Sequence, residues 1–123
     1  MIYETWKKWH ECRDLILPSL ALMATHTEDD ILVMLAQGKL KLWKGEKSAI
    51  VSQIIDEPQM RVLVFFLAGG VVDELKMMAA EIEQYGIEQG CAMAEGTGRK
   101  GFASFFSDYN DGGHRRYKEL SHA

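Results

Sequence analysis

The chain has few residues of the kinds that mark disulfide-rich, membrane-spanning or nucleic-acid-binding proteins. Among 123 residues there are two cysteines and two prolines, and 18 acidic residues outnumber 14 basic ones, for a formal charge of −4. Cys12 and Cys91 lie far apart, which speaks against a disulfide framework or a CxxC metal knuckle and predicts buried thiols in a reducing compartment. The longest apolar run, Val62 to Leu67, is far shorter than the roughly 20 residues of a membrane helix.

The acidic balance gives no electrostatic reason to expect nucleic acid as a partner. Two basic pairs, Arg99-Lys100 and Arg115-Arg116, are too few to follow a phosphate backbone, and we interpret them as solvated surface. The first residues lack the basic and apolar regions of a signal peptide, so we expect none and predict a cytoplasmic location. Apolar residues make up 47% of the chain, which suits a single domain over residues 1–123 with its own core.

Two helices are predicted in the first third of the chain. Thr5 to about Leu17 has apolar residues, including Trp6 and Trp9, at roughly helical spacing. Pro18 should end or kink this helix, because proline cannot donate a hydrogen bond to the preceding turn, and a last turn over Ser19 to Ala24 is left open. Thr27 is suited to cap a second helix, because three acidic residues and then an apolar run follow it.

Strand patterns occupy the middle of the chain. Lys39–Leu42 alternates with period two, and Ala49–Ile55 is rich in β-branched residues. Arg61–Leu67 is nearly all apolar, which predicts a central strand covered on both faces. Short turns join these three strands, so they should pair antiparallel.

A long helix and several short elements follow a glycine pair. Residues from Val71 to about Gln89 have helical periodicity. The buried stripe of that helix should contain Val71, Leu75, Met78, Ile82 and Tyr85. The helix is a crossover, so Cys91–Ala94 is predicted as a strand parallel to the central one. A helix over Gly98–Tyr109, a loop over Asn110–Gly113 and a strand over His114–Leu120 complete the pattern.

These elements predict an α/β (α+β) domain with a central, mostly antiparallel sheet and helices on both faces. The core should contain Trp6, Trp9, Leu63, Phe65, Leu75, Ile82 and Phe102.

The order of elements resembles that of the GNAT (N-acetyltransferase) superfamily over roughly Thr5 to Leu120. The most specific features are the central strand, the glycine turn Ala68-Gly69-Gly70 and the long helix after it. The stretch Gly98-Arg99-Lys100-Gly101-Phe102 is similar to a GR-x-G-aromatic segment of short GNAT-like proteins encoded by bacteriophages. The resemblance implies a GNAT-like fold and makes acetyl-CoA the cofactor to consider.

The cofactor positions that the resemblance implies are only partly suited to that role. In active members acetyl-CoA enters a gap between two splayed strands, and backbone N–H groups at the start of the long helix hold its pyrophosphate. The matching residues here are Ala68, Gly69, Gly70, Val71 and Val72. They lack the Arg/Gln-initiated spacing of the family loop, and the next residue, Asp73, is acidic. We favour the simpler interpretation, in which the glycines only turn a strand into a helix, and expect no cofactor.

The catalytic positions that the resemblance implies are also poorly filled. Many members use a glutamate near the central strands as a base and a tyrosine on the last helix as an acid. The central strand has no carboxylate, and Glu57 lies in a proline turn where we expect it to be solvated. Tyr109 is the nearest substitute for the tyrosine, although we favour an ordinary half-buried aromatic. No metal site is predicted, because histidines, cysteines and carboxylates share no ligand spacing.

Two functions are therefore open. The first is a degenerate GNAT-like phage or prophage protein that acts through protein contacts, for example as a virion or assembly component. Its partners would be other virion proteins or a second copy of itself, in the virion or the host cytoplasm. The alternative is an acetyl-CoA-dependent N-acetyltransferase with an atypical active site, which leaves open whether the protein is an enzyme.

Overall fold

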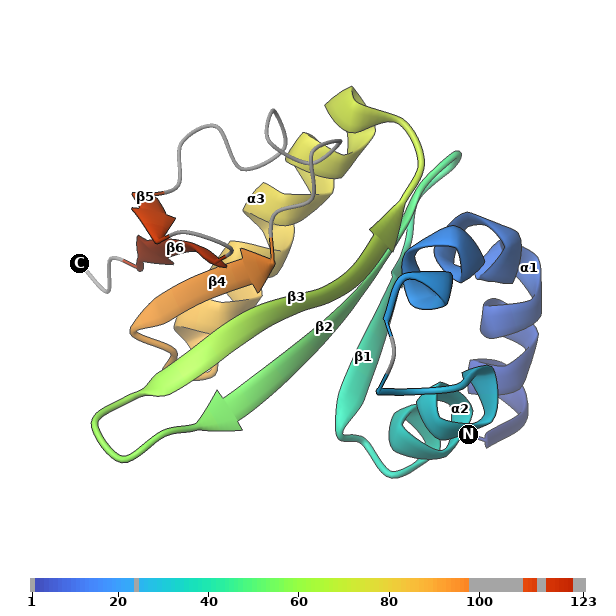
Figure 1. Cartoon of the computed structure of the whole chain (residues 1–123), viewed down its shortest axis with the longest axis horizontal. Coiled ribbons are helices and arrows are strands. Elements are labelled where there is room, and N and C mark those ends of the chain that lie inside the picture. The colour runs from blue at the N-terminus through green and yellow to red at the C-terminus, as the bar shows by residue number, and fades with distance from the viewer. Residues whose placement is uncertain (1, 24, 98–109, 113–114, 121–123) are drawn as a thin grey trace.

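The computed structural model describes residues 2–23, 25–97, 110–112 and 115–120, and these form an α+β fold (Figure 1). The first half contains helices α1 (Ile2–Ala21) and α2 (Glu28–Ala36) and strands β1 (Leu40–Lys44), β2 (Ala49–Asp56) and β3 (Arg61–Gly69). The second half contains helix α3 (Val72–Glu88) and strands β4 (Met93–Thr97), β5 (Asn110–Gly112) and β6 (Arg115–Glu119).

The strands form one mixed sheet in the order β1-β2-β3-β4-β6-β5. The three strands β1, β2 and β3 pair antiparallel, as their short turns predict. Helix α3 returns β4 beside β3 in parallel, and the two remaining pairings are antiparallel. The mostly antiparallel sheet and the parallel crossover are therefore confirmed.

Helices cover both faces of the sheet, and each face has its own core cluster. Helix α3 packs on one face around Leu63, Phe65 and Ile82. Helices α1 and α2 lie together against β1 and the neighbouring strands on the other face (Figure 1). Their core cluster, the α1 cluster, contains Trp9, Ile16 and Ile31. This arrangement confirms the prediction of helices on both faces.

Of the outcomes predicted at Pro18, an end to the helix does not occur: α1 continues to Ala21, within the stretch where a last turn was left open. Proline removes one backbone donor from the helix, which is a local cost. Ile16 and Leu20 on either side of it are buried in the α1 cluster. Burial of these side chains offsets the missing hydrogen bond, because tertiary packing supplies most of the stability of a helix in a protein.

Glu28 ties the start of α2 to α1. Its carboxylate accepts a hydrogen bond from Trp9 Nε1 at 2.8 Å and two from the Arg13 guanidinium at 2.7 Å each. These contacts lower the pKa of Glu28 to about 2, with the Arg13 hydrogen bonds as the main cause. The predicted cap is confirmed, since Thr27 and Asp30 form a reciprocal capping box just before this contact.

Most of the predicted core is confirmed, and two residues are not where they were expected. Trp9, Leu63, Phe65, Leu75 and Ile82 are all buried. Trp6 is instead 48% exposed and Val71 is also exposed. With 3.6 residues per turn, Trp6 lies roughly 75° around α1 from the centre of the buried face, so a spacing of three residues from Trp9 does not bring it into the core. Val71 precedes the first residue of α3 and therefore lies outside its stripe.

The C-terminal predictions are only partly met. Asn110–Gly112 is strand β5 rather than loop, because its backbone pairs with β6 despite poor strand propensity. Strand β4 begins two residues later than expected and runs past Ala94 to Thr97. The expected helix over residues 98–109, with Phe102 and Tyr109, lies outside the described residues.

Candidate functional site

The two glycines of the β3–α3 turn are surrounded by protein backbone. A Cβ at Gly69 would lie 1.7 Å from the carbonyl oxygen of Leu15 in α1. Gly70 has a φ of +130°, and a Cβ there would lie 2.4 Å from Ser48 in the turn between β1 and β2. Both glycines are thus explained by close packing of this turn against its neighbours, without a ligand.

The turn also uses its polar groups within the fold. The backbone N–H of Val71 donates to Ser48 Oγ at 2.9 Å. The Glu74 carboxylate, in the first turn of α3, accepts hydrogen bonds from the backbone N–H groups of Glu46 and Lys47, both at 2.9 Å. The Ser48 hydroxyl is the first cause of the lowered pKa of Glu74, followed by these backbone donors. Ser48 therefore takes one N–H group of the glycine turn, while the Glu74 carboxylate takes two donors of the β1–β2 turn and places negative charge at the start of α3.

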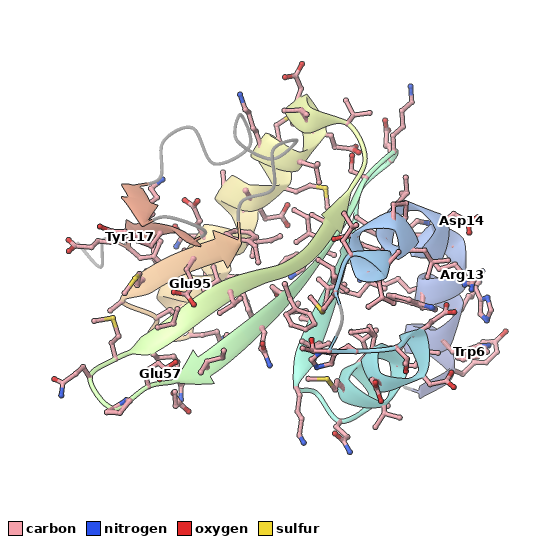
Figure 2. All side chains as sticks on the ribbon, viewed as in Figure 1. Trp6, Arg13, Asp14, Glu57, Glu95 and Tyr117 are labelled. Carbon is pink, nitrogen blue, oxygen red and sulfur yellow. The ribbon has the colours of Figure 1, made fainter. Side chains whose placement is uncertain are left out.

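The candidate catalytic residues do not gather at this turn. Glu57 lies at the tip of the β2–β3 hairpin and is exposed (Figure 2). The turn Ala68–Val72 follows the opposite end of β3, and nine residues of strand span about 30 Å. Tyr109 lies outside the described residues. The structure therefore does not bring Glu57 and the turn together.

Sequence reasoning missed a carboxylate and a phenol that share one face of the sheet. Glu95 on β4 pairs with Val64 on β3 and with Tyr117 on β6. Alternation places all three on the face opposite α3, because Ala94 beside Glu95 packs in the α3 cluster. Figure 2 shows Glu95 and Tyr117 on their neighbouring strands. The signal that was missed is the alternation of large and small residues over Met93–Gly96. This alternation indicates that the strand continues past Ala94.

Within the described residues, the pairing of β3 with β4 ends at Phe65, while β3 itself continues to Gly69. The parallel register runs from Val62 with Met93 to Phe65 with Gly96. The next residue, Phe66, forms a β-bulge: on β2, Ser52 pairs with Phe65 and Val51 pairs with Leu67, so Phe66 has no partner in the register. A bulge bends its strand and increases the local twist. The end of β3 thus leaves the β3–β4 register just before the glycine turn.

A second candidate region lies on the outer side of α1. We use the name outer stripe for five exposed residues within roughly 100° of helix arc: Tyr3, Trp6, Lys7, His10 and Asp14. Tyr3 is 73% exposed, and the Trp6 and His10 rings make an edge contact with centroids 4.5 Å apart. Figure 2 shows Trp6 and Asp14 pointing away from the body of the molecule. Large apolar residues gathered on a surface mark interaction sites more often than scattered ones do.

The described part of the chain was predicted to contain no metal site, no membrane helix and two buried thiols. Within it, no group of three or more His, Cys, Asp or Glu side chains is arranged to hold a metal ion. None of its helices is both long enough and apolar enough to cross a membrane. Cys12 and Cys91 are both buried thiols, and burial raises the pKa of each.

Comparison of the chain with family models, with curated proteins and with solved structures finds no match.

Proposed function

We propose that this chain is a GNAT-like phage or prophage protein that acts through protein contacts, as a virion or assembly component would. The observation that carries the proposal is the outer stripe, where Tyr3 and Trp6 are exposed beside His10 on one side of α1. Tryptophan and tyrosine are enriched at protein interfaces because they bury a large area and lose little side-chain entropy. The phage assignment rests on the sequence resemblance alone.

The glycine turn supports a function without acetyl-CoA. A phosphate cradle needs several backbone N–H groups that converge on an empty space. Here the Val71 N–H at the start of α3 is already bonded to Ser48 Oγ. Asp73 and Glu74 also place negative charge in the first turn of α3, where they would repel a pyrophosphate.

Acetyl-CoA binding tests the proposal directly. Titration calorimetry at micromolar protein should detect no binding, and the thermal midpoint should not move with added acetyl-CoA. A ligand at 100 times its dissociation constant would stabilise the fold by about 2.7 kcal/mol, which such a scan resolves easily. Coenzyme A and desulfo-CoA serve as matched ligands, because they separate recognition of the pyrophosphate from recognition of the thioester. A micromolar dissociation constant for acetyl-CoA would overturn the proposal.

The alternative function is an N-acetyltransferase with an atypical site, and one observation favours it. Glu95 and Tyr117 form a cross-strand pair beside the point where β3 leaves the β3–β4 register. A carboxylate base and a phenol acid are the groups that acetyl transfer to an amine uses. If this function holds, acetyl transfer should fall by about 10²-fold or more in Glu95→Gln or Tyr117→Phe. The neighbouring exposed Glu119→Gln is the matched control and should keep full activity.

A further inference from the structure

We infer that the outer stripe of α1 docks the same stripe of a second copy of this chain, with the two helices antiparallel about a twofold axis near His10. The inference rests on the proposed function and deepens it, because it names the protein partner as the chain itself.

The apolar part of the outer stripe is directed away from the core of its own chain. Helix α1 buries a different side, on which Trp9 and Ile16 are fully enclosed. Tyr3 and Trp6 therefore remain 73% and 48% exposed although they belong to the same helix. Trp6 is held against His10 by the edge contact, so a partner meets an ordered aromatic pair and loses little entropy on docking.

The charges of the stripe select the antiparallel orientation. Lys7 lies three residues before His10 and Asp14 four residues after it, and both are exposed. In an antiparallel pair the Lys7 ammonium of each copy faces the Asp14 carboxylate of the other. In a parallel pair like charges would meet, which opposes association. Antiparallel helix dipoles also attract one another.

The Asp14 carboxylate is accessible for this contact. Its side chain is 94% exposed, and the Arg13 guanidinium approaches it only to 3.8 Å. Arg13 itself is bound to Glu28 by two hydrogen bonds of 2.7 Å. Asp14 thus keeps its charge outward, where a lysine from a second helix reaches it.

Self-complementarity is the reason for choosing a second copy over another partner. A twofold interface uses one patch twice, so that patch must contain both members of every charged pair. The outer stripe meets this condition, because Lys7 and Asp14 are placed almost symmetrically about His10. A contact between two single helices buries less than the roughly 1,200 Å² of a standard interface, so the dimer should be weak and reversible.

Sedimentation equilibrium from about 1 μM to 1 mM chain tests the inference. The wild type should show a monomer–dimer equilibrium in that range. Trp6→Glu should remove the dimer. Lys7→Glu and Asp14→Lys should each weaken it by roughly 3- to 30-fold, because two exposed ion pairs become like-charge contacts. The double variant Lys7→Glu/Asp14→Lys should restore it.

Met77→Glu is the matched control, because Met77 is 75% exposed on α3, away from the stripe, and should leave the dimer unchanged. Circular dichroism checks that each variant keeps its fold. A chain that stays monomeric up to 1 mM, or a dimer that survives Trp6→Glu, would overturn the inference. So would a double variant that associates no better than the single ones. None of these results depends on acetyl-CoA. The proposed function is tested separately, by the acetyl-CoA titration.

Discussion

Alanine at position 69 would place a methyl group against the backbone of α1. Its Cβ would lie 1.7 Å from the Leu15 carbonyl oxygen, whereas even a close carbon–oxygen contact is about 3.3 Å. Helix α1 and β3 would have to separate by roughly the difference, about 1.6 Å. Both sides of the contact are backbone, so no side-chain rotation relieves it. Such a separation would loosen the α1 cluster around Ile16 and Leu67.

The expected cost of Gly69→Ala is about 3 kcal/mol or more, at the upper end for overpacking of a core. Gly90→Ala is the matched control: Gly90 has a φ of +85° and nothing within 4 Å of an added Cβ. That variant should lose only about 1–2 kcal/mol, from the left-handed backbone. Gly69 is absent from the positive-φ glycines, so its cost is one of packing alone.

Guanidinium unfolding followed by tryptophan fluorescence measures both variants, because Trp9 is fully buried in the α1 cluster. Failure of Gly69→Ala to fold would agree with the expected cost. A loss below about 1 kcal/mol, or one no larger than that of the control, would refute the packing explanation of the turn. The glycine would then be available for another role, such as close approach of a ligand.

Two further changes test the clusters on the two faces of the sheet. Glu28→Gln should cost about 1–2 kcal/mol at pH 7, because the hydrogen bonds from Arg13 lose their charge assistance and exposure to solvent weakens them. Since the folded-state pKa of Glu28 is lowered from 4.5 to about 2, its contribution is complete above pH 4.5 and lost as the pH falls toward 2. Urea unfolding between pH 2 and 7 should show that the free energy of unfolding falls with decreasing pH in the wild type and falls less in the variant. An equal dependence of that free energy on pH in the two proteins would contradict the prediction. Phe65→Ala, on the α3 face, should cost roughly 3–5 kcal/mol, and a loss below about 1 kcal/mol in denaturant unfolding would place Phe65 at the surface.

Local patterns in the sequence were enough to predict the main elements. The period-two and all-apolar segments became β1, β2 and β3, and the 3.6-residue period before Gln89 became α3. Thr27 capped α2 as expected, because capping depends on side chains only three residues apart. The antiparallel meander and the parallel β4 followed from loop length and from the handedness of crossovers, which are properties of chain connectivity.

The candidate site was less predictable, because it depends on contacts distant in sequence. The sequence indicated that Gly69 and Gly70 turn a strand into a helix. It could not show that the space they leave is taken by the Leu15 carbonyl and by Ser48. The pair of Glu95 and Tyr117 was missed because it depends on strand register, which joins residues 22 positions apart.

The sequence by itself determined the periodicity of the longer segments, and with it the helices α1 to α3, the strands β1 to β3 and their order, because backbone geometry and side-chain alternation act over a few residues. Tertiary structure decided between the outcomes open at Pro18: α1 passes through it, since burial of Ile16 and Leu20 outweighs a lost hydrogen bond. It also decided that Trp6 faces solvent. Helical spacing indicates that two residues lie near the same face of a helix. The neighbouring helices and strands determine which part of that face is buried. The outer stripe exists for that reason: α2 and the sheet cover one side of α1 and leave the other exposed.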